Sequence, residues 1–164
     1  MSSSLDLAAG VSTPAAPARW IDPRGQRFGA GFSAAVLALA VATDSLWLAA
    51  AIGLALAVSS SFGTRWFVFG RPWPLIRSVL RLAPVEPEHE YPPRFAQALG
   101  AIFVGIGALL LVVGLAPWGW IPILGVVALQ VVLAATGYCL GCRLYFVRWY
   151  IPALFTRLIR RSAA

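Results

Sequence analysis

Two cysteines, Cys139 and Cys142, are the residues of this sequence best suited to covalent chemistry, and they lie in the segment GYCLGCRLY. Residues at this spacing share one face of a helix, at a separation that allows a disulfide between them. Such a pair can cycle between dithiol and disulfide within one chain. We therefore predict a redox pair in which Cys139 is the attacking thiol and Cys142 is the resolving thiol.

The neighbouring residues favour a reactive thiolate at Cys139. Gly137 can end the preceding helix, so that Cys139 begins a new helix at the positive end of its dipole. Arg143 follows Cys139 by about one helical turn and adds a positive charge. Because the thiolate is the nucleophile, we predict that Arg143 stabilises the thiolate of Cys139.

Two other interpretations of the cysteine pair stay open. Cysteine also behaves as a small buried hydrophobic residue, so both side chains could simply pack. A Cys-x-x-Cys pair is also half of a four-ligand zinc site, and His89 with a neighbouring acid, or a second subunit, would have to supply the rest. If a metal binds, Cys139 and Cys142 are its expected ligands; we predict no resident cofactor.

The composition of the chain excludes an ordinary soluble domain. Of its 164 residues, 60% are hydrophobic and 12% are charged, whereas soluble domains average roughly 25% charged residues. The net charge of +7 comes from 13 arginines against six acids. These arginines flank apolar runs, which indicates membrane-surface charge and argues against binding to nucleic acid.

Four apolar runs predict an all-α integral membrane protein with four transmembrane helices. About 20 helical residues cross a bilayer, and the expected spans are residues 28–43, 46–62, 95–116 and 121–138. The first run is short unless residues 25–27 extend it. Gln130 is the strongly polar residue deep in these runs, and we expect its amide to bond a neighbouring helix.

The arginines predict the topology of the four spans. The two connections TDS (43–45) and PWGW (117–120) contain none, while all 13 lie in the N-terminal flank, the central loop or the C-terminal flank. By the positive-inside rule, both termini are expected in the cytoplasm, and Trp118 and Trp120 at the outer interface.

The remaining segments complete the predicted domain organisation. Residues 1–19 are expected to be a disordered cytoplasmic tail, residues 20–149 the transmembrane domain, and residues 150–164 a basic amphipathic cytoplasmic tail. Both halves of the domain begin with Arg-Phe, at 27–28 and 94–95, which favours two parallel helical hairpins. The segment from Pro74 to Leu82 predicts a short helix lying in the membrane interface.

Three segments in order, DPRGQRF (22–28), PPRFAQALG (92–100) and GYCLGCRLY (137–145), resemble a bacterial family of small membrane proteins. That family is classed as a domain of unknown function and ends in Cys-Leu-Gly-Cys. The resemblance runs from Trp20 to about Trp149 and implies a multi-pass protein of the bacterial inner membrane. Genes of the family often lie near those for thioredoxin-like and rhodanese-like proteins, which implies thiol or sulfane-sulfur chemistry with such a partner.

These observations leave functions of different classes. The first is a membrane-bound thiol/disulfide or sulfur-relay protein that meets a soluble thioredoxin-like or rhodanese-like protein at the cytoplasmic face of the bilayer. The alternatives are a small carrier or channel component for a soft metal or sulfur species, and a non-catalytic scaffold. The lack of charge in the apolar runs weakens the carrier. Enzymatic activity and homo-oligomerisation stay open.

Overall fold

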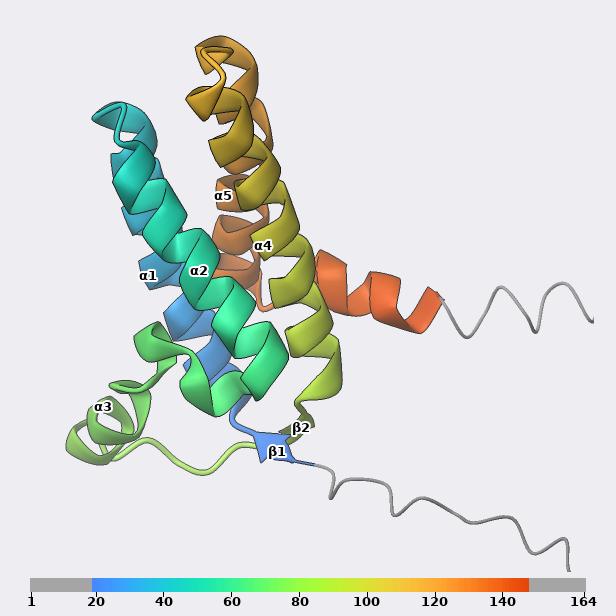
Figure 1. The fold of residues 1–164 in the computed structure, drawn as a ribbon. Helices are drawn as coiled ribbons and strands as arrows, with labels where there is room; N and C mark the ends of the chain where they lie inside the picture. Colours follow the sequence, from blue (N-terminus) through green and yellow to red (C-terminus); the bar gives the residue numbers. More distant parts are fainter. Residues whose placement is uncertain (1–18, 148–164) are drawn as a thin grey trace, which may run out of the picture.

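A computed structural model describes residues 19–147, and four long helices form most of this range (Figure 1). They are α1 (Pro23–Ala42), α2 (Leu46–Phe62), α4 (Tyr91–Val112) and α5 (Ala116–Thr136). α1, α4 and α5 are long and apolar enough to cross a membrane, and α2 is a shorter apolar helix. The predicted helical class is confirmed, and the helices are consistent with a multi-pass membrane protein. Apart from residue 19, the two predicted tails lie outside the described residues.

Capping chemistry extends α1 beyond its predicted start at residue 28. The Asp22 carboxylate accepts a hydrogen bond from the backbone N–H of Arg24 at 2.9 Å, and Pro23 occupies the first turn. An acidic N-cap followed by proline is a favoured helix start. Residues 25–27 therefore belong to α1, which reaches 20 residues. α2 covers the predicted residues 46–62.

The predicted connection at residues 117–120 is wrong by about four residues. Gly114 adopts a left-handed backbone (φ +82°) just after α4, and proline lies in the first turn of α5. Glycine ends helices in this conformation and proline begins them. The turn is therefore at residues 113–115, and the Trp120 indole N–H donates to the Asp44 carboxylate (2.9 Å).

The two most extensive helix pairs join different halves of the chain. α1 packs chiefly against α5, α2 against α4, and α4 against α5. Arg94 of α4 donates to the carbonyl oxygens of Ser60 and Ser61 at the end of α2, at 3.0 and 2.8 Å. Arg27 of α1 does the same to two carbonyl oxygens in the last turn of α5, at 3.2 and 3.0 Å. Each half thus caps a helix of the other half, and the predicted arrangement of parallel hairpins stays a prediction.

Close packing in the core depends on small residues between α4 and α5. A side-chain carbon built on Gly107 would lie 2.6 Å from the carbonyl oxygen of Gly119. Glycine lets membrane helices approach to this degree, because it removes the atoms that would separate the backbones. The fully buried aliphatic side chains of the core come from all four long helices: Leu37, Ile52, Leu56, Val104 and Ile123.

The segment between α2 and α4 covers one end of the bundle (Figure 1). It forms the short helices η1 (Thr64–Trp66), η2 (Val68–Gly70) and α3 (Trp73–Val79). α3 overlaps the helix predicted at 74–82, but it begins one residue earlier and ends at Val79. Its placement on a membrane surface stays a prediction. Strand β2 (Glu88–His89) then pairs antiparallel with β1 (Trp20–Ile21). This pairing ties the central loop to the chain just before α1.

We predict that Gly107→Ala lowers the stability of the bundle, because the added methyl group meets the Gly119 carbonyl. Overpacking of this kind costs about 1–3 kcal/mol. Thermal unfolding of the purified protein in detergent measures the effect. Gly105→Ala is the matched control, since Gly105 lies on the same helix with no atom within 4 Å of the added carbon. Equal melting temperatures for the two variants would contradict the predicted contact.

Candidate functional site

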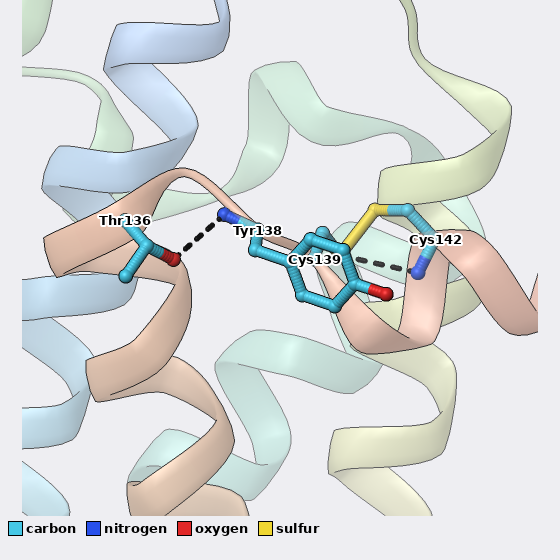
Figure 2. Close-up of a disulfide and its surroundings, with 4 residues drawn as sticks. All are labelled: Thr136, Tyr138, Cys139 and Cys142. Carbon is cyan, nitrogen blue, oxygen red and sulfur yellow. Dashed lines mark hydrogen bonds between the residues drawn. A yellow bond between two sulfur atoms is a disulfide. The ribbon is translucent and has the colours of Figure 1, made fainter.

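A helix break at Gly137 positions the cysteine pair. α5 ends at Thr136, and Gly137 follows in the left-handed conformation (φ +77°). The Thr136 hydroxyl oxygen then accepts the backbone N–H of Tyr138 at 3.0 Å, which stabilises the turn (Figure 2). Helix resumes over residues 140–147. The predicted break at Gly137 is therefore confirmed.

The two cysteines lie at the start of this second helix and are disulfide-bonded (Figure 2). Their Cα atoms are 5.2 Å apart. Cys139 directly precedes the helix, and its sulfur accepts the backbone N–H of Cys142 at 3.1 Å, as an N-cap side chain does. The Cys142 N–H thus lies at the Cys139 sulfur, and the predicted thiolate at Cys139 stays a prediction.

Arg143 lies beside the pair but is directed over an aromatic ring. Its guanidinium carbon is 5.5 Å from the centre of the Tyr138 ring, a cation–π distance. Its backbone N–H donates to the carbonyl oxygen of Cys139 at 3.1 Å. The structure therefore brings Arg143 to the pair, while its predicted role in stabilising the thiolate stays a prediction. The hydrogen bond to the Cys139 sulfur comes from the backbone N–H of Cys142.

The cysteine-bearing helix rests against the beginning of α4. A side-chain carbon built on Gly141, between the two cysteines, would lie 2.7 Å from the Ala96 side chain. The Phe95 and Tyr145 rings are 5.8 Å apart. Both cysteines are half-buried by these contacts. The disulfide is thus held on a packed surface and remains accessible.

Two hollows meet at Cys139. The inner cavity, of about 260 Å³, lies among the bundle helices, and its wall includes Ser33, Phe67, Gln97, Phe103, Gln130 and Cys139. The outer pocket, of about 450 Å³, includes Trp20, Arg27, His89, Tyr138, Arg143 and both cysteines. The inner wall is mainly apolar, whereas the outer wall mixes aromatic and charged side chains. Cys139 is therefore shared by two very different environments.

All three glutamines of the chain, Gln26, Gln97 and Gln130, line the inner cavity. The Ser33 hydroxyl donates to the Gln130 amide oxygen at 2.7 Å, which confirms the predicted bond between Gln130 and a neighbouring helix. The hydroxyl of Ser59 on α2 donates in the same way to Gln97 on α4, also at 2.7 Å. Sequence reasoning missed Gln97, although a chain with no asparagine and three glutamines offered a signal.

The zinc interpretation of the pair finds no second set of ligands in residues 19–147. No group of three or more His, Cys, Asp or Glu side chains comes together within that range. The His89 ring instead stacks against Trp20, with ring centres 4.0 Å apart. His89 lines the outer pocket, but as part of the β1–β2 pairing.

Comparison with known proteins identifies a family. Residues 21–149 match the family described as a domain of unknown function (DUF4395). This range contains the four long helices and the cysteine pair. No curated protein and no solved structure matches the chain.

We predict that Gly137→Ala destabilises the protein, because an L side chain is strained at this positive φ and would lie 3.3 Å from the Arg27 guanidinium. A left-handed residue other than glycine costs about 1–2 kcal/mol. Thermal unfolding measures the loss, and gel shift after thiol blocking measures the fraction of closed disulfide, which should fall. Gly125→Ala on α5 is the control, with open space around the added carbon. An unchanged melting temperature for Gly137→Ala would count against the strained turn.

Proposed function

The chain belongs to the DUF4395 family, and on that premise we propose that it is a membrane-bound thiol–disulfide exchange protein. Cys139 and Cys142 are its reactive pair, and a soluble thioredoxin-like or rhodanese-like protein is its partner. The observation that carries the proposal is the disulfide at a helix start, where the backbone N–H of Cys142 reaches the Cys139 sulfur. Reactive cysteine pairs are favoured at such positions.

The exchange proceeds in two steps that conserve electrons. The Cys139 thiolate attacks a disulfide of the partner, forming a mixed disulfide and releasing one partner thiolate. The Cys142 thiolate then attacks the Cys139 sulfur, closes the internal disulfide and releases the second partner thiol. Two electrons and two protons pass to the partner, and the reverse sequence returns them. With a rhodanese-like partner that carries a persulfide, the Cys139 thiolate would instead attack the outer sulfur, so that the partner's S–S bond breaks, the partner's thiolate leaves and Cys139 holds the persulfide.

We place this exchange at the cytoplasmic face of a bacterial inner membrane, with α2 as a fourth span. Every described arginine lies before α1, in the first two turns of α1 or α4, between α2 and α4, or after α5. The helix over residues 140–147, which carries Cys142, begins at the same end of the bundle (Figure 1). Arginine at one end supports a cytoplasmic location for that end. With 17 residues, α2 is at the lower limit for a span.

No specific observation favours the alternative functions. A soft-metal carrier would need further ligands near the thiols, and residues 19–147 hold no cluster of three or more candidate ligands. A scaffold whose cysteines only pack does not need a half-buried pair on the wall of an open pocket. Thiol exchange uses both the partial exposure of the pair and the open pocket beside it.

The Cys142→Ser variant tests the proposed function. Because the resolving thiol is missing, the mixed disulfide between Cys139 and the partner should accumulate to at least tenfold the level of wild type. Purified membranes are incubated with an oxidised thioredoxin-like protein, and the adduct is identified by mass after alkylation. Cys139→Ser is the matched control and should form at least tenfold less adduct. Equal adduct from both variants, or none from either, would overturn the assignment.

The proposed topology predicts which sites a reporter can reach. A phosphatase that is active only outside the cytoplasm should be inactive when fused after Ala164 and active when inserted in the turn at 43–45 or 113–115. The arginine distribution is the physical reason. A fluorescent protein that folds only in the cytoplasm should give the opposite pattern. An active phosphatase after Ala164 would place the cysteine pair on the other side of the membrane.

A further inference from the structure

Cys139 separates the interior of the bundle from its arginine-rich end. It lines the inner cavity and the outer pocket, as do Gln26 and Leu133. Cys142 lines the outer pocket. A soluble partner approaching the outer pocket would therefore meet the pair on one side, while a molecule in the inner cavity would meet the Cys139 side chain on the other.

The inner cavity has the size and walls of a site for a small ring. Its volume is about 260 Å³, and its lining contains aliphatic and aromatic side chains, three glutamines, a serine and Cys139, with no charged residue. An apolar protein cavity of roughly 150 Å³ is large enough to bind benzene. The inner cavity can thus hold a substituted ring of one or two cycles, and it disfavours a charged ligand.

Amide donors in the cavity point to the polar groups of that ring. Gln97 is only 8% exposed, and its oxygen already accepts the Ser59 hydroxyl. Within residues 19–147, the amide nitrogens of Gln97 and Gln130 have no hydrogen-bond acceptor, and neither is fully sealed from the cavity space. Both nitrogens keep accessible surface, and both glutamines line the cavity, so these N–H groups can donate to a molecule held there. A ligand with carbonyl oxygens would pair them.

The cavity also communicates with the apolar surface of the bundle. Phe103 on α4, Leu129 on α5 and Leu144 line it, and these three side chains are 48%, 47% and 48% exposed. In a membrane, apolar side chains of this kind face lipid. A lipid-soluble ligand can therefore enter from the bilayer.

We propose that the inner cavity binds the ring of a lipid-soluble quinone, which takes electrons from the reduced Cys139–Cys142 pair. The proposal rests on the exchange function proposed above and names its second substrate. The two thiols lose two electrons and two protons and form the disulfide. The quinone gains them, and its two carbonyl groups become the hydroxyl groups of a hydroquinone. The amide N–H groups of Gln97 and Gln130 donate to the ring oxygens, where negative charge develops.

The test uses the full-length protein in lipid nanodiscs, reduced and freed of reductant. The probe is a short-chain benzoquinone substituted at every ring carbon, so that thiols cannot add to the ring. Quinone absorbance and free thiols are followed together after mixing. We expect one quinone reduced for every two thiols lost, at least tenfold faster than with a Cys-Leu-Gly-Cys peptide. A rate equal to that of the peptide would overturn the proposal.

Cavity variants locate the reaction. Leu129→Trp places an indole at the cavity wall and should slow quinone reduction at least tenfold, because the larger side chain fills space that the ring needs. Gln97→Leu removes one donor and should slow quinone reduction about tenfold, the effect of roughly one lost hydrogen bond to a ligand. Leu124→Trp is the control, since Leu124 is 46% exposed on the same helix and lies outside the cavity lining. Equal rates for Leu129→Trp and Leu124→Trp would refute the cavity site.

The same samples separate this inference from the function on which it rests. Exchange with an oxidised soluble thioredoxin-like protein is measured in parallel and should change less than twofold in Leu129→Trp. If soluble exchange occurs and the quinone does not react, the quinone site is wrong and the exchange function stands. If the quinone reacts and soluble exchange is absent, the exchange function is wrong and the quinone site stands. A pair inert to both refutes both.

Discussion

The capping of helix ends by arginines from the other half of the chain is the constraint on which this structure depends. The last carbonyl groups of a helix have no partner within the helix, and an apolar surrounding makes them costly to leave unpaired. Arg27 and Arg94 each place a planar, charged fork on two adjacent carbonyl oxygens, which also complements the negative helix end. Arg27 fixes where α5 stops, and the guanidinium lies against the Gly137 turn that leads to Cys139.

This arrangement gives the site its two-sided character. The turn at Gly137 directs the chain away from α5, so Cys139 begins a helix across the opening of the bundle and lies over the beginning of α4. The same thiol then borders an apolar interior and a surface with arginine, histidine and tyrosine side chains. A redox pair in the middle of a span would lack the polar contact, and one on a tail would lack the apolar contact. The place of the cysteine pair in the fold, more than the charges near it, decides which molecules it can contact.

The sequence was informative about features that depend on local chemistry. Apolar runs predicted the helices, residues 46–62 coincide with α2, and Gly137 predicted the break before Cys139. It failed at the α4–α5 turn, where two tryptophans suggested an interface but the backbone of Gly114 set the boundary. It also missed Gln97, because the Ser59 partner and the inner cavity exist only once α2 and α4 are adjacent. Spacing along a chain does not specify which helices become neighbours.

The exchange of caps has a consequence for biosynthesis. The first half emerges from the ribosome with the Arg27 side chain lacking its α5 carbonyl groups and with the last turn of α2 awaiting Arg94. Neither cap can form until the second half of the chain is present. The arrival of α4 and α5 completes both, since one helix brings the missing donor and the other brings the missing acceptors. A fragment ending after α2 therefore lacks both caps, and both form only when all four long helices are present.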